Sequence, residues 1–168
     1  LKHIVLQASL PYPDKQKLEE NLNSSNNWEE LIRSLQDEKT LPLFYQNLKD
    51  LDLIHLIPET KREDIKNILR RQAMRQLNQR SVFAETVRLL KENQVPFIPI
   101  KGITLLNSVY SNPALRPMLD IDLLVKPEDT ERITRLMKEQ GARQHTGLQS
   151  EYLDSFVQHI PPFNWKNT

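Results

Sequence analysis

The sequence predicts an α+β fold, in which a helical first half precedes a small mixed β-sheet with flanking helices. Two observations predict this order. Residues 1–92 contain no glycine and repeat apolar side chains at helical spacing. Beyond residue 93, short apolar segments alternate with helical patterns, which is typical of strands and helices in turn. We therefore expect a helical region at 1–92 that packs on a core at 93–168, and we expect that core to be truncated at its C-terminal end.

The composition is that of an ordinary globular protein. A chain of 168 residues is long enough to bury a core, and a net charge of +1 gives no strong overall attraction to nucleic acid. The absence of cysteine excludes disulfides and thiolate metal sites. It fits a reducing compartment, so we expect a cytoplasmic protein. No apolar run approaches the roughly 20 residues that cross a bilayer, and we expect no membrane partner.

Two helices of the first half can be placed from their start signals. The first follows Asn27, and four apolar side chains share one of its faces: Trp28, Leu31, Ile32 and Leu35. The second begins near Thr40 and carries Pro42 in its first turn, where proline is well tolerated.

The longest predicted helix begins after Pro58-Glu-Thr60 and reaches Glu92, and a break within it stays open. Its predicted apolar stripe consists of Ile65, Leu69, Ala73, Leu77, Ala84 and Val87. Its first half is basic, with Lys61, Arg62, Lys66, Arg70, Arg71, Arg75 and Arg80 set against Glu63 and Asp64. Two interpretations stay open: a solvated helix face, or a surface that binds phosphate.

The second half predicts a strand, a tight turn and a helix, followed by another strand and helix. Residues 95–100 form the first strand, Lys101 and Gly102 the turn, and residues 103–110 the helix. Residues 120–125 form an apolar strand interrupted by two acids. The helix that follows starts at Pro127, runs to 139 and is ended by Gly141.

Asp120 and Asp122 are the most informative residues of the predicted second strand. Side chains alternate along a strand, so both carboxylates and Leu124 would share a face, with their Cα atoms about 7 Å apart. Two acids on an apolar strand repel each other, and a bound cation offsets that cost. Oxygen ligands favour Mg²⁺ or Mn²⁺. The alternative is that Asp120 caps the strand and Asp122 pairs with Arg116, or that both acids lie on a solvent-facing side of the strand.

Lys101 and Gly102 lie between a strand and a helix, where backbone N–H groups and the lysine charge can hold phosphate oxygens. Arg116, four residues before Asp120, offers a second phosphate contact. The alternative for the Lys-Gly pair is an ordinary connecting turn.

Residues 95–142, taken in order, resemble the uncharacterised nucleotidyltransferase family of the polymerase-beta-type superfamily. The resemblance rests on the strand and Lys-Gly turn of Phe97-Ile-Pro-Ile-Lys-Gly-Ile-Thr-Leu-Leu, on Tyr110, on Leu115-Arg-Pro-Met-Leu-Asp-Ile-Asp-Leu-Leu-Val and on Gly141. The helical first half is similar to the leader of this family. In the wider superfamily the turn is commonly Gly-Ser, so Lys101 and Ile103 flanking Gly102 are a departure.

This resemblance implies a function and a site. Asp120 and Asp122 would bind divalent metal, Gly102 would shape the phosphate turn, and Lys101 and Arg116 would contact the triphosphate. The activity would be metal-dependent transfer of a nucleoside monophosphate from a nucleoside triphosphate to a hydroxyl of a small molecule, a protein or a nucleic acid.

A third carboxylate, usual in the superfamily on a later strand, has no convincing counterpart here. Glu151 and Asp154 fall in a predicted helix and are poor candidates. We expect that the chain ends before this acid, and the alternative is a catalytically silent nucleotide-binding or regulatory module. His159 is expected to be structural rather than catalytic, and Trp165 to be a packing residue with a structural role rather than a base-stacking platform.

Overall fold

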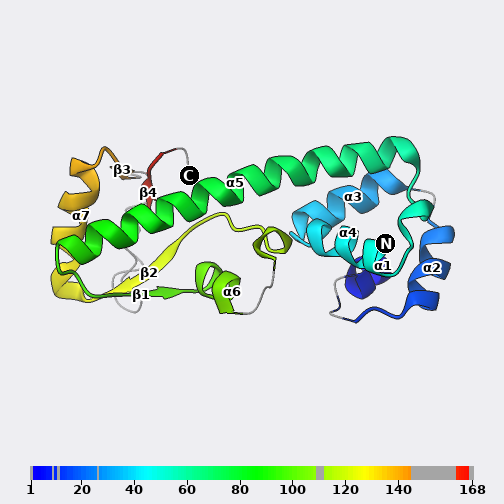
Figure 1. The fold of residues 1–168 in the computed structure, drawn as a ribbon, viewed down its shortest axis with the longest axis horizontal. Helices are drawn as coiled ribbons and strands as arrows, with labels where there is room; N and C mark the ends of the chain where they lie inside the picture. Colours follow the sequence, from blue (N-terminus) through cyan, green and yellow to red (C-terminus); the bar gives the residue numbers. More distant parts are fainter. Residues whose placement is uncertain are drawn as a thin grey trace, which may run out of the picture. The chain divides into compact units, whose positions relative to one another are not determined.

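The computed structural model describes residues 2–8, 10, 12–25, 27–108, 112–144 and 162–166 (Figure 1). The chain forms two compact units. Unit 1 comprises Leu1–Gln76 and Leu105–Met118, and unit 2 comprises Leu77–Thr104 and Leu119–Thr168. One long helix contributes residues to both. The predicted boundary at residues 92 and 93 stays a prediction.

Unit 1 is helical. Its elements are α1 (Lys2–Ala8), α2 (Lys15–Asn23), α3 (Trp28–Asp37), α4 (Leu41–Asp50), the short 3₁₀ helices η1 (Ile54–Leu56) and η2 (Pro113–Leu115), and the first half of α5 (Glu59–Glu92). Its core contains the fully buried side chains Leu18, Leu31, Leu35, Leu41, Phe44, Leu48 and Ile65. The apolar face predicted for α3 is confirmed, since Leu31, Ile32 and Leu35 are buried and Trp28 packs against them.

The start signals of α3 and α4 act as expected. Oδ1 of Asn27 accepts a hydrogen bond from the backbone N–H of Glu30 at 3.1 Å, and Nδ2 of Asn27 donates to the Glu30 carboxylate at 3.0 Å. This reciprocal contact satisfies a backbone donor of the first turn. In α4, Pro42 lies in the first turn after Thr40. Both predicted helices are confirmed.

Three helices of this glycine-poor half end on a residue in the left-handed conformation. Lys39, Asp52 and Gln94 follow α3, α4 and α5 with φ of 58°, 58° and 52°. In each case the next backbone N–H donates to a carbonyl five residues back, as from Thr40 to Leu35 at 2.8 Å. Glycine is the usual residue here because it has no Cβ. These helices therefore close at a conformational cost that glycine would avoid.

The long helix α5 is confirmed as one unbroken element from Glu59 to Glu92, but its predicted apolar stripe is wrong in part. Ile65 is fully buried, whereas Leu77 is 59% exposed and Ala84 is exposed. The reason is geometric: steps of four residues rotate the stripe about 40° per step around a helix of 3.6 residues per turn. The buried positions of its middle are Gln76, Gln79 and Val82, none of which belongs to the predicted stripe.

Unit 2 contains the strands, the second half of α5, the start of α6 (Gly102–Ser108) and the helices that follow the second strand, whereas α6 from Leu105 onward belongs to unit 1. Strand β1 (Phe97–Ile100) pairs antiparallel with β2 (Asp122–Val125), and β3 (Arg143–Gln144) pairs antiparallel with β4 (Phe163–Asn164). Helix α6 follows β1, and η3 (Pro127–Asp129) leads into α7 (Thr130–Glu139). The α+β fold class is confirmed. Among the described residues the strands form two separate antiparallel pairs rather than one mixed sheet.

Two hydrogen bonds fix the chain where α7 ends in the core of unit 2. Gly141 has φ of 81°, and the N–H of Ala142 donates to the carbonyl of Met137 at 3.0 Å, so the predicted glycine stop is confirmed. Trp165 is 6% exposed, and its indole N–H donates to the carbonyl of Gln140 at 3.0 Å. Its expected structural role is confirmed.

Several sequence expectations fall on residues outside the described part of the chain. These are Tyr110, Glu151, Asp154 and His159. Among the described residues, no helix has the length and apolar character needed to cross a membrane.

Candidate functional site

The β1–β2 ribbon positions Asp122. In its register Ile100 lies opposite Asp122, and Ile98 lies opposite Leu124. The ribbon packs one face on the core of unit 2 through Leu123 and neighbouring apolar residues. On its other face Ile98 and Leu124 are 60% and 55% exposed. Because side chains alternate along a strand, Asp122 shares this exposed face with Leu124, as predicted.

The strand prediction for residues 120–125 is two residues too long. Strand β2 begins at Asp122 because its partner ends at Ile100, where the chain turns away and offers no backbone for pairing with residues 120 and 121. Asp120 is exposed and lies just before the strand. Strand alternation therefore orients Asp122 but does not orient Asp120. The joint action of the two carboxylates stays a prediction.

Lys101 is the immediate electrostatic neighbour of Asp122. Its Nζ donates to Oδ1 of Asp122 at 3.1 Å, and the two side chains are 61% and 26% exposed. Arg116 is the cation that one interpretation of the sequence pairs with Asp122, whereas the structure places Lys101 beside this carboxylate. The contact follows from the register, since Lys101 comes directly after the residue opposite Asp122. A phosphate contact by Lys101 stays a prediction.

The backbone at Lys101 is strained, and a side-chain hydrogen bond of Thr104 stabilises the turn. Lys101 has φ of 55°, a left-handed conformation that costs a residue with a Cβ roughly 1–2 kcal/mol. Gly102 then opens α6, and the Thr104 hydroxyl donates to the carbonyl of Pro99 at 2.7 Å across the turn. Sequence reasoning missed Thr104. Its position two residues after Gly102, within reach of the end of β1, was the available signal.

Arg116 belongs to the other unit. It follows η2, is half-buried and lies in unit 1, whereas Lys101, Gly102, Asp120 and Asp122 lie in unit 2. The neighbouring Met118 is 7% exposed, and its carbonyl accepts from Nε2 of the buried Gln76 at 3.4 Å. This contact ties the Arg-Pro-Met segment to α5. The phosphate contact of Arg116 stays a prediction.

The donor atoms present suit a hard divalent cation. Among the described residues, no group of three or more His, Cys, Asp and Glu side chains gathers into a possible metal site. Mg²⁺ is commonly held by one or two carboxylates and completes its shell with water and substrate phosphates. Asp122, partly exposed on the ribbon, and the exposed Asp120 carry carboxylates of this kind, and their binding of a cation stays a prediction.

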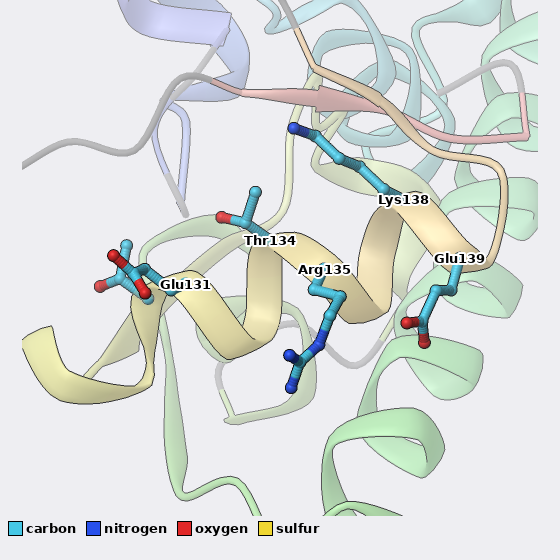
Figure 2. A pocket seen from close by; sticks show the side chains of 6 residues that line it. Glu131, Thr134, Arg135, Lys138 and Glu139 are labelled. Atoms are coloured by element: carbon cyan, nitrogen blue, oxygen red, sulfur yellow. The ribbon is translucent and has the colours of Figure 1, made fainter.

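A pocket of about 600 Å³ lies elsewhere in unit 2, along α7. Its lining residues all belong to that helix: Thr130, Glu131, Thr134, Arg135, Lys138 and Glu139. Figure 2 shows Thr134 and Lys138 on one side of the helix and Arg135 and Glu139 on another. None of the predicted site residues lines this pocket, so it gives no support to their assignment.

Comparison with known proteins identifies the family. The family model described as an uncharacterised nucleotidyltransferase matches residues 24–162, most of the chain and all of the predicted site residues. The match includes α3, α4 and α5 as well as the β1–β2 ribbon. No curated protein and no solved structure gives a significant match. The chain belongs to the uncharacterised nucleotidyltransferase family.

Proposed function

We propose that the protein transfers a nucleoside monophosphate from a nucleoside triphosphate to a hydroxyl acceptor, with Asp120 and Asp122 binding a divalent cation. The observation that carries this proposal is the placement of Asp122. It lies on the exposed face of the ribbon, beside Lys101, within a chain of a nucleotidyltransferase family. A carboxylate and an ammonium at one strand end supply a metal ligand and a phosphate contact.

In this reaction the acceptor hydroxyl oxygen forms a bond to the α-phosphorus. The bond between that phosphorus and the oxygen bridging to the β-phosphorus breaks, pyrophosphate leaves, and the hydroxyl proton is released to solvent. Mg²⁺ or Mn²⁺, when bound, neutralises triphosphate charge and activates the hydroxyl.

The side chains have separate parts in the proposal. Asp120 and Asp122 hold the cation. Lys101 contacts the triphosphate, and its braced turn fixes the start of the lysine side chain. Gly102, which lacks a Cβ, lets the backbone come close to phosphate. Arg116 is assigned a second phosphate contact by the family resemblance alone.

The test is transfer of label from α-³²P nucleoside triphosphates with Mg²⁺ or Mn²⁺ and a panel of small-molecule, protein and RNA acceptors. We expect metal-dependent transfer that is lost in Asp120→Asn and Asp122→Asn. The matched control is Glu128→Gln, an exposed acid of the same unit that pairs with Lys126 at 3.6 Å. Transfer that survives both aspartate substitutions would refute the site.

A second candidate is a catalytically silent nucleotide-binding or regulatory module. It is favoured by the absence, among the described residues, of a third acidic ligand beside the pair. Equilibrium dialysis with Mg²⁺ and labelled nucleoside triphosphate separates the two. Binding that depends on Asp122, with no transfer to any acceptor, supports the silent module. Turnover supports the enzyme.

A further inference from the structure

We propose that unit 1 carries a binding surface for the phosphodiester backbone of nucleic acid, formed by Arg33 on α3 and by Arg70, Arg71 and Arg75 on α5. The proposal does not rest on the proposed transferase activity, since the surface shares no residue with the Asp120–Asp122 site. We refer to these four side chains as the arginine surface.

The cations of α5 differ in whether they have acidic partners. The cations of its first two turns each have an acidic partner: Lys61 with Glu29 at 2.7 Å, Arg62 with Glu59 at 2.8 Å and Lys66 with Glu63 at 2.6 Å. The arginines of the next two turns lack such partners among the described residues. Arg70, Arg71 and Arg75 are exposed, and within the described part of the chain none has an acidic side chain within 4.0 Å.

Arg70, Arg71 and Arg75 lie close together on the surface of α5. Residues three and four apart adjoin on a helix surface, so Arg71 and Arg75 adjoin each other, and Met74 adjoins both Arg70 and Arg71. Like charges spaced by four residues destabilise a helix unless an anion offsets them. Met74 is 67% exposed and provides an apolar contact among the cations. This arrangement suits a charged backbone that carries apolar groups.

A groove between α3 and α5 extends the arginine surface onto α3. A polar groove of about 450 Å³ is lined by residues of α3 and α5: Glu29, Ile32, Arg33, Gln36, Lys61, Asp64, Asn67, Ile68 and Arg71. Lys61 offsets both of its acids, since its Nζ lies 2.7 Å from Glu29 and 3.9 Å from Asp64. Arg33 and Gln36 are exposed. Two guanidinium groups on different helices can contact successive phosphates, and the amides can bond to sugars or bases.

All four cations are arginines, whose planar donor groups match phosphate oxygens in two-bond contacts better than lysine does. A chain of phosphates satisfies cations spread over two helices, whereas a single phosphorylated side chain would meet only one or two of them. The groove also favours a strand over a flat lipid surface. These features favour nucleic acid over a phosphorylated protein or a lipid surface as the ligand of the arginine surface.

The test uses fluorescence anisotropy of the full chain with a labelled 20-nucleotide single-stranded RNA over a range of salt concentrations. We expect binding that weakens steeply with salt because counterions are released. The variant Arg70→Gln/Arg71→Gln/Arg75→Gln should weaken binding by at least about tenfold and lower the slope of log K against log salt by about 2.

The matched control is Arg62→Gln/Lys66→Gln/Arg88→Gln, which removes equal charge from ion-paired positions of the same helix that do not line the groove. It should weaken binding much less, and circular dichroism must show both variants folded. Equal loss in the two variants, or no salt-dependent RNA binding, overturns the proposal. So does binding to anionic phosphatidylserine vesicles that needs the arginines while RNA binding does not. Transferase activity on a small acceptor should not change in the arginine variant.

Discussion

The ammonium nitrogen of Lys101 lies 3.1 Å from Oδ1 of Asp122, so the cation of the β1–α6 turn neutralises the first carboxylate of β2. The contact joins two residues that the sequence argument assigned to different ligands, one to phosphate and one to metal. A cation bound at Asp122 therefore competes with the Lys101 ammonium. Release of that ammonium would leave it available to the triphosphate.

Replacing Lys101 by glutamine should separate these two effects. Affinity for Mn²⁺ alone should rise by about twofold to fivefold, since an exposed ion pair contributes up to about 1 kcal/mol. Affinity for nucleoside triphosphate should fall. Electron paramagnetic resonance of free Mn²⁺ measures the first, and equilibrium dialysis the second. Lys126→Gln, which disrupts the exposed pair with Glu128, should change neither. Weaker Mn²⁺ binding in Lys101→Gln would contradict the competition.

Replacing Lys101 by glycine should stabilise the fold while impairing nucleotide binding. The positive φ of Lys101 destabilises the fold by roughly 1 kcal/mol or more, because its Cβ is crowded there, and glycine has no Cβ. Chemical denaturation should therefore show a gain of about 1 kcal/mol in the free energy of unfolding. Gln94→Gly, at the left-handed end of α5, is the matched control. It should give a similar gain with no effect on nucleotide binding. A destabilised Lys101→Gly would show that its left-handed backbone is not strained.

The corrected packing of α5 predicts contrasting effects for two apolar residues of that helix. Ile65→Ala should lower the free energy of unfolding by about 2–5 kcal/mol, because Ile65 is fully buried. Leu77→Ala should change it by less than about 0.5 kcal/mol, because Leu77 is 59% exposed. Urea denaturation followed by circular dichroism measures both. A large loss of unfolding free energy in Leu77→Ala would contradict the exposure of Leu77 and support the apolar stripe predicted from the sequence.

The ion pair between α3 and α5 predicts a pH effect. The hydrogen bond from Lys61 lowers the pKa of Glu29, so the folded state holds this carboxylate charged at a pH where the unfolded chain begins to protonate it. The pair thus stabilises the fold above the unfolded pKa, and this contribution is lost as pH falls through the lowered one. Carboxyl NMR titration should show the low pKa of Glu29 return toward its ordinary value in Lys61→Gln. An unchanged pKa in that variant would contradict the pairing.

Much of the fold follows from local signals in the sequence. Asn27 and Gly141 mark the start of α3 and the end of α7, because both act through backbone hydrogen bonds within a few residues. The exposure of Leu77 could not be predicted in this way. It depends on the rotation of a 34-residue helix against its neighbours and on buried glutamines that carry no apolar signal.

The site was predictable in its residue types but not in its contacts. The order of Lys101, Gly102, Asp120 and Asp122 along the chain indicates a nucleotidyltransferase. The pairing of Lys101 with Asp122 depends on the register that sets Ile100 opposite Asp122, which a single sequence does not specify. The strand length has the same origin, because β2 cannot extend to Asp120 once β1 has ended.

The fate of the phosphates tests the proposed reaction most directly. The full chain is incubated with Mg²⁺ or Mn²⁺, an acceptor identified by the label-transfer screen, and ATP labelled in parallel at the α- or the γ-phosphate. Nucleotidyl transfer predicts that α-label appears on the acceptor and γ-label in pyrophosphate, with both lost in Asp122→Asn. Transfer of γ-label to the acceptor, or release of γ-label as inorganic phosphate alone, would contradict the account.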